Sequence, residues 1–112
     1  MSPVETLAPS PEAVQGLADR IAGEYHPDKV ILFGSRAYGT PHADSDVDLL
    51  VILSFEGKTS RKSVEILDYL NVFFPLDIVV RRPEDVERRY REGDPLIREA
   101  LDRGKVLYER NG

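Results

Sequence analysis

Two short apolar runs constrain the fold of this chain more than any other feature. The first spans Lys29–Phe33 and the second spans Val47–Leu53. Both have the length of strands, and the second is apolar on both of its faces, which predicts a central strand of a sheet. With 112 residues, the chain is long enough for a single domain with a small core.

Helices are predicted before, between and after these strands in the sequence. The first helix begins with Ser10 as its N-cap and Pro11 at its first position, and it ends near Tyr25, because Pro27 disfavours helical geometry in the residue before it. The helix predicted at 60–73 is expected to carry an apolar stripe of Val64, Leu67 and Leu70 with Ile66 and Phe73 beside it, and Phe73 is expected in the core. Further elements are predicted as a brief helix at 35–39, helices at 60–73, 83–92 and 95–102, and strands at 76–80 and 105–108.

The boundaries of the folded part follow from the same patterns. Residues 1–9 contain prolines and little periodicity, which predicts a flexible lead-in, and residues 10–112 are expected to form one domain. No apolar run approaches a membrane span of roughly 18 residues, and no secretion signal is expected. The absence of cysteine excludes a disulfide frame and favours a cytoplasmic protein.

The charge balance argues against a broad nucleic-acid surface. The chain has 15 Lys and Arg against 20 Asp and Glu, a formal net charge of −5. Arginines cluster at 81–91, but acids are interspersed with them. We therefore interpret this segment as a mixed-charge, solvated helix face, or as a face on which a partner docks.

The candidate metal-binding and phosphate-binding residues cluster around the first two strands. Asp46 and Asp48 lie two residues apart at the head of the second strand, so both carboxylates can face the same point. Such hard oxygen ligands suit Mg²⁺, which often binds one or two carboxylates together with substrate phosphates. Gly34 and Ser35, directly after the first strand, can bring backbone N–H groups and a hydroxyl to those phosphates. The alternative is a pair of acids that cap a turn.

A third acid, Asp77, interrupts the apolar strand at 76–80. An ionisable group there is costly unless it is paired or bound. If the two strands pair, Asp77 can lie beside the other two acids, and three converging carboxylates favour one or two divalent ions. A salt bridge from Asp77 to Arg81 or Arg82 is the alternative.

Together these residues resemble the nucleotidyltransferase superfamily related to DNA polymerase beta, and within it the minimal, antitoxin-type nucleotidyltransferases of prokaryotes. The signature of that family is a Gly-Ser pair, a later Asp-x-Asp motif and a separate third acid in a following strand. It matches Gly34–Ser35, then Asp46 and Asp48, then Asp77. The resemblance covers roughly residues 12–108.

The resemblance implies an α+β nucleotidyltransferase fold, with a small mixed sheet of three or four strands and helices packed mainly on one face. It implies Mg²⁺-dependent transfer of a nucleoside monophosphate, AMP from ATP, to an acceptor hydroxyl. Asp46, Asp48 and Asp77 would be the catalytic metal ligands. Gly34, Ser35 and Arg36 would hold the triphosphate. Many relatives have an arginine where this chain has Tyr38, so nucleotide affinity here is expected to be lower.

The same resemblance implies a partner, a helical HEPN-domain toxin that the transferase modifies as its antitoxin. Two other functions remain open: an antitoxin that neutralises its partner by contact alone, and a transferase for a small-molecule acceptor. The chain has little surface for selecting an acceptor, so a second copy or the partner is expected to complete the site. The base preference and the number of metal ions stay open.

Overall fold

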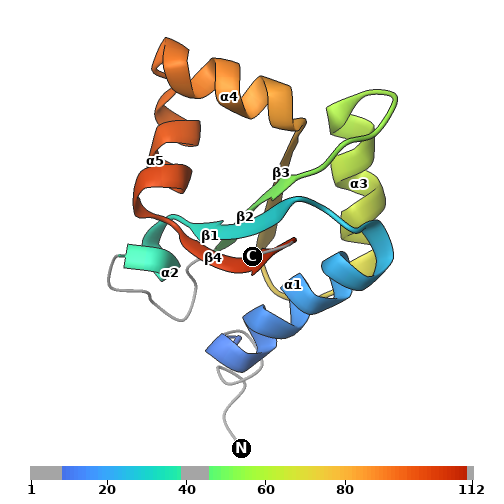
Figure 1. Cartoon of the computed structure of the whole chain (residues 1–112). Coiled ribbons are helices and arrows are strands. Elements are labelled where there is room, and N and C mark those ends of the chain that lie inside the picture. Colours follow the sequence, from blue (N-terminus) through green and yellow to red (C-terminus); the bar gives the residue numbers. More distant parts are fainter. Residues whose placement is uncertain (1–8, 39–45, 111–112) are drawn as a thin grey trace, which may run out of the picture.

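The computed structural model describes residues 9–38 and 46–110 (Figure 1). Most of the predicted lead-in therefore lies outside the described residues. The elements are α1 Pro11–Tyr25, β1 Lys29–Phe33, α2 Ser35–Tyr38, β2 Val47–Ile52, α3 Thr59–Leu70, β3 Leu76–Arg81, α4 Pro83–Glu92, α5 Pro95–Arg103 and β4 Lys105–Glu109. Among these helices, none is both long and apolar enough to cross a membrane.

The four strands form one mixed sheet in the order β3-β2-β1-β4. Strand β1 is antiparallel to both β2 and β4, whereas β2 and β3 run parallel. The predicted α+β class and mixed sheet are confirmed, and β2 is an interior strand as its apolar pattern predicts. The parallel pairing places the beginnings of β2 and β3 side by side at one end of the sheet.

Helices cover both faces of the sheet, and the cluster of buried apolar residues is larger on one face than on the other. The larger cluster lies on the face covered by α1 and α3, around buried residues such as Ile21, Leu49 and Ile66. A smaller cluster lies on the other face, where Ile97 of α5 and Val86 of α4 pack over the sheet. Because side chains alternate along β2, the odd-numbered positions serve the first cluster and the even-numbered positions face α4 and α5.

The ends of α1 confirm the predicted signals. The Ser10 hydroxyl accepts a hydrogen bond from the Ala13 N–H at 3.1 Å, and Pro11 occupies the first helical position. The helix ends at Tyr25, and His26 adopts a left-handed conformation with φ 52°. This cap turns the chain directly into β1.

The structure contradicts two expectations about α3. Phe73 was expected in the core, yet its side chain is 90% exposed. The helix ends at Leu70 with Asn71 in a left-handed conformation, so Phe73 lies beyond the helix and off its apolar stripe. Val64 was expected on that stripe but is exposed, because it lies two residues, or roughly 200° of rotation, from the buried Ile66.

Candidate functional site

The parallel pairing of β2 and β3 brings two of the predicted acids together. Asp48 and Asp77 are direct partners in the register of these strands. Residues at matched positions of paired strands point to the same face of the sheet, here the face covered farther along by α4 and α5. Asp46 precedes β2 and is solvent-exposed. The three acids therefore lie at the same end of the sheet, as the sequence predicts.

Asp77 does not carry the desolvation cost that its apolar sequence context suggests. Its side chain is exposed, because β3 is an edge strand and Asp77 is only its second residue. The alternative pairing with Arg81 or Arg82 is also absent among the described residues. Both arginines instead donate to backbone carbonyls, Arg81 to that of Val80.

Gly34, the first residue of the Gly-Ser turn, lies close to the Asp48 carboxylate. It follows β1 with φ 81°, a conformation that favours glycine, and its neighbour Phe33 is the register partner of Asp48. A Cβ atom at position 34 would overlap the Asp48 carboxylate. The backbone conformation at position 34 therefore favours glycine, and any larger residue would also displace the Asp48 carboxylate.

The electrostatics of the site centre on Asp48. Burial, followed by the negative charges of Asp77, Asp46 and Glu99 in that order, raises the pKa of the Asp48 carboxyl to about 6. Glu99 belongs to α5 and has no signal in the sequence that links it to the other acids. Only the packing of α5 over the sheet brings it close enough to affect Asp48.

The phosphate-binding candidates divide between two regions. Gly34 lies against Asp48, and Ser35 is exposed at the start of α2. The Arg36 guanidinium donates to the Pro9 carbonyl at 3.4 Å, close to the beginning of α1. The side chain of Tyr38 and the loop residues His42 and Asp44 lie outside the described residues.

The donor chemistry of the acids fits Mg²⁺, since all of them offer carboxylate oxygens and the crowding of like charge around Asp48 favours a bound cation. Across residues 9–38 and 46–110, however, no group of three or more potential ligands is arranged to hold a metal ion. The structure thus places two adjacent carboxylates and nearby acids, and the metal ligation by Asp46, Asp48 and Asp77 stays a prediction.

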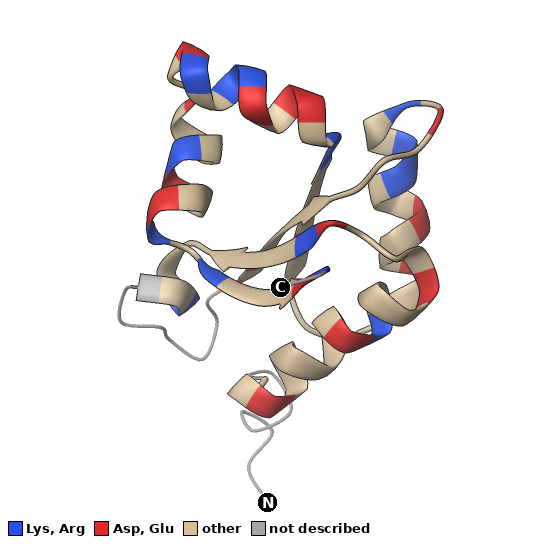
Figure 2. Ribbon diagram, in the orientation of Figure 1, with Lys and Arg blue, Asp and Glu red and all other residues tan. Residues whose placement is uncertain are grey.

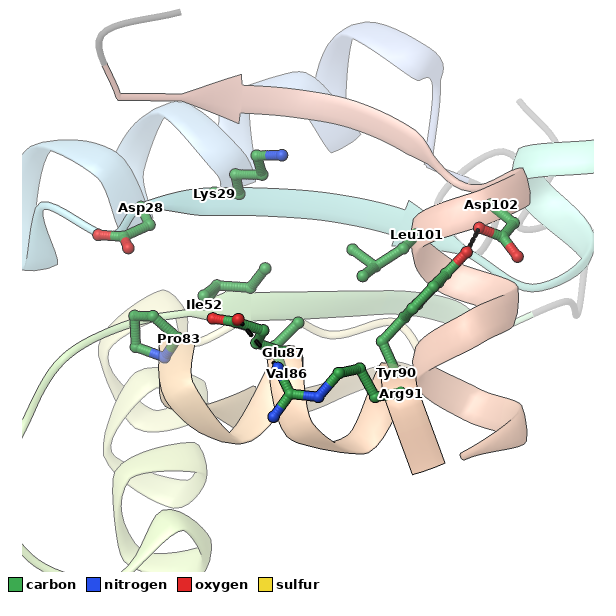
Figure 3. A pocket seen from close by; sticks show the side chains of 10 residues that line it. All are labelled: Asp28, Lys29, Ile52, Pro83, Val86, Glu87, Tyr90, Arg91, Leu101 and Asp102. Carbon is green, nitrogen blue, oxygen red and sulfur yellow. Dashed lines mark hydrogen bonds and ion pairs between the residues drawn. The ribbon is translucent and has the colours of Figure 1, made fainter. Parts of the chain in front are cut away.

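A separate cavity of about 610 Å³ lies between α4, α5 and the sheet (Figure 3). Its apolar lining includes Ile52, Val86 and Leu101, and a hydrogen bond of 2.7 Å joins Tyr90 to Asp102 at its edge. The described residues that line it include none of the predicted site residues. This cavity is therefore distinct from the acidic end of β2 and β3.

Known proteins resemble this chain both in sequence family and in fold. Residues 16–112 match the family described as polymerase beta, nucleotidyltransferase. A search of curated proteins finds no match. Solved structures share the fold at low sequence identity, among them the following three.

The first is a candidate nucleotidyltransferase from Sulfolobus solfataricus, with a TM-score of 0.61 and 16% identity, covering 87% of this chain and 78% of that protein. The second is a toxin–antitoxin complex with AMP-PNP, with a TM-score of 0.54 and 19% identity over 85% of this chain and 73% of the other. The third is an Asp-to-Glu double mutant of the toxin–antitoxin pair MntA–HpeT, with a TM-score of 0.52, 17% identity and the same coverage.

Proposed function

Since this chain belongs to the polymerase beta nucleotidyltransferase family, we propose that it transfers a nucleoside monophosphate, AMP from ATP, to an acceptor hydroxyl. The observation that carries this proposal is the register pairing of Asp48 with Asp77, with Gly34 against the Asp48 carboxylate. In this reaction the acceptor oxygen forms a bond to the α-phosphorus. The bond from that phosphorus to the bridging oxygen breaks, pyrophosphate leaves, and the acceptor hydroxyl loses its proton.

Each residue has a proposed role in that reaction. Asp46, Asp48 and Asp77 would hold Mg²⁺, which when bound neutralises phosphate charge and lowers the pKa of the acceptor hydroxyl. The missing side chain at Gly34 lets the Asp48 carboxylate lie against the turn, and the backbone N–H groups of this turn would bind the triphosphate. The hydroxyl of Ser35 is exposed and available to a phosphate oxygen.

Arg36 has a competing contact in this structure, because its guanidinium donates to the Pro9 carbonyl at 3.4 Å. Phosphate binding by Arg36 therefore requires the guanidinium to leave the Pro9 carbonyl. A charge-assisted hydrogen bond to phosphate is stronger than one to a neutral carbonyl, and this supports such a movement.

The acceptor is proposed to be a hydroxyl on a partner protein, a helical toxin of the HEPN class, with this chain acting as its antitoxin in the cytoplasm. Two of the structural neighbours are toxin–antitoxin complexes, one of them with AMP-PNP. In the other complex, two aspartates two positions apart are replaced, and Asp46 and Asp48 have the same spacing. A second copy of this chain is the other candidate for completing the acceptor site.

Neutralisation by contact alone is the second candidate function. It is supported by the two structural neighbours that are toxin–antitoxin complexes, and the presence of all three acids counts against it. This function needs no nucleotide, so it predicts that Asp46→Asn and Asp48→Asn proteins still protect cells from the toxin.

The proposed transfer is tested with ATP labelled at the α-phosphate. The protein is purified together with the product of the neighbouring gene and incubated with and without Mg²⁺. Label on the partner that disappears with EDTA and with Asp48→Asn supports the proposal, and Asp68→Asn on the exposed side of α3 serves as the matched control. A stable complex without transfer of label contradicts it and favours neutralisation by contact.

A further inference from the structure

A second cavity, far from the acids, has the character of an anion site. It has a volume of about 410 Å³ and lies between the start of α3 and the junction of β3 with α4. Its charged lining residues are Lys58, Arg81, Arg82, Arg89 and Asp85. Figure 2 shows basic residues at the start of α3 and at the end of β3 where it leads into α4, in a protein whose net charge is −5.

Most of the positive charge in this cavity has no carboxylate to balance it. Within the part of the chain that the structure describes, Lys58, Arg81 and Arg82 form no ion pair. Asp85, the acid in the lining, is paired with Arg88 at 3.1 Å. The cavity therefore holds three uncompensated cations close together, an arrangement that a bound anion would stabilise.

Arg82 is held in place before any ligand binds. Its Nε donates to the Phe55 carbonyl at 3.0 Å, and one of its terminal nitrogens donates to the Gly57 carbonyl. The guanidinium also stacks 4.2 Å from the centre of the Phe55 ring. These partners are neutral, so they fix the orientation of the guanidinium without cancelling its charge.

Helix α3 and Arg89 contribute further polar groups to the lining of the cavity. Helix α3 begins there with Lys58 as its N-cap, which makes no side-chain hydrogen bond to the first N–H groups of the helix. These N–H groups can bind an anion and carry the positive end of the helix dipole. The buried Nε of Arg89 also has no hydrogen-bond partner among the described residues, although its terminal nitrogen pairs with Asp94 at 3.1 Å.

We propose that this cavity binds the phosphate groups of a small molecule, separately from the catalytic acids. The juxtaposition of Lys58, Arg81 and Arg82 at the start of α3 suits a multiply charged phosphate, because guanidinium groups match phosphate oxygens and provide several donors at once. Arg81 lies four residues after Asp77 on β3, or about 13 Å along the strand. A phosphate bound here is therefore at the opposite end of the strand from the acids.

The test uses pyrophosphate as the probe, in the presence of EDTA so that no metal-dependent binding occurs at the acids. Calorimetry at low salt should detect binding to the full-length protein, and Arg82→Gln and Lys58→Gln should each weaken it about tenfold or more, since each removes a charge-assisted hydrogen bond. Lys58 is exposed, so Lys58→Gln remains informative if the Arg82 variant fails to fold.

Arg91→Gln is the matched control, because it removes the same charge from α4 but lies outside this cavity. Asp48→Asn should bind pyrophosphate as tightly as the wild type does. Equal affinity in the Arg82, Lys58 and Arg91 variants would overturn the proposal, as would undetectable binding at millimolar pyrophosphate. ATP titrated in EDTA identifies the source: tighter binding than pyrophosphate assigns a nucleotide, and equal binding assigns the phosphates alone.

Discussion

Gly34 and Asp48 lie so close together that a side chain on the glycine would occupy the position of the aspartate carboxylate. The contact joins the turn after β1 to the second acid of the Asp-x-Asp motif. It also explains why a glycine is needed at this point, because the turn and the acid must share the same small volume. Any change at position 34 should therefore alter the acid as well as the backbone.

The first prediction separates these two effects. Gly34→Ala should lower the free energy of unfolding by roughly 2–4 kcal/mol, because it combines backbone strain at φ 81° with overlap against Asp48. Gly93→Ala has a similar φ of 84° and open space around it, so it should cost only the backbone part, about 1 kcal/mol. Chemical denaturation measures both, and equal losses would contradict the contact.

The second prediction concerns pH. The pKa of Asp48 is about 6 in the folded protein, above the ordinary value of 3.8, so the folded state binds more protons than the unfolded state between these values. The metal-free protein should therefore lose stability from this group as the pH rises from about 4 to about 6. After allowance for solvent screening, Asp48→Asn should be more stable than the wild type at pH 7.5 by on the order of 1 kcal/mol.

The difference in unfolding free energy between Asp48→Asn and the wild type should vanish near pH 4, where Asp48 is protonated in the folded state. Asp68→Asn provides the control for a carboxylate lost from an exposed helix position. A constant difference between wild type and Asp48→Asn over pH 4 to 7.5 would show that the crowding of negative charge has no effect on stability.

The third prediction is that Mg²⁺ stabilises the protein through the acids. A ligand that binds only the folded state adds about 2.7 kcal/mol at a concentration of one hundred times its Kd. Thermal unfolding at pH 7.5 should therefore show a higher Tm with Mg²⁺ for the wild type and a much smaller increase for Asp48→Asn. An identical increase in both proteins would place the Mg²⁺ elsewhere.

The fourth prediction distinguishes two adjacent aromatic residues. Phe73 is 90% exposed, so Phe73→Ala should change the free energy of unfolding by less than about 0.5 kcal/mol. Phe74 packs against the larger core cluster, so Phe74→Ala should cost roughly 1–3 kcal/mol, less than for a fully buried phenylalanine. Urea denaturation of the two variants, side by side, measures the contrast, and a large loss for Phe73→Ala would contradict its exposure.

Local patterns in the sequence were sufficient for most of the secondary structure. The N-cap at Ser10, the turn at His26 and the bounds of β1 were all predicted, because caps and apolar runs act over a few residues. The interior position of β2 also followed from its own sequence, since a strand that is apolar on both faces must be covered on both. The position of Asp46 and Asp48 at the head of β2 came from the same evidence, whereas Asp77 was expected inside an apolar strand and lies near the exposed beginning of β3.

Only the tertiary structure decided how these acids are surrounded. The register of β3 beside β2 places Asp77 opposite Asp48, and the packing of α5 adds Glu99 to the charges that act on Asp48. The exposure of Phe73 likewise depends on where α3 stops relative to the sheet. The sequence determines which residues can form elements and carry charge, because those properties are local. Register, burial and the meeting of distant charges depend on how the elements pack, so they emerge only in the folded chain.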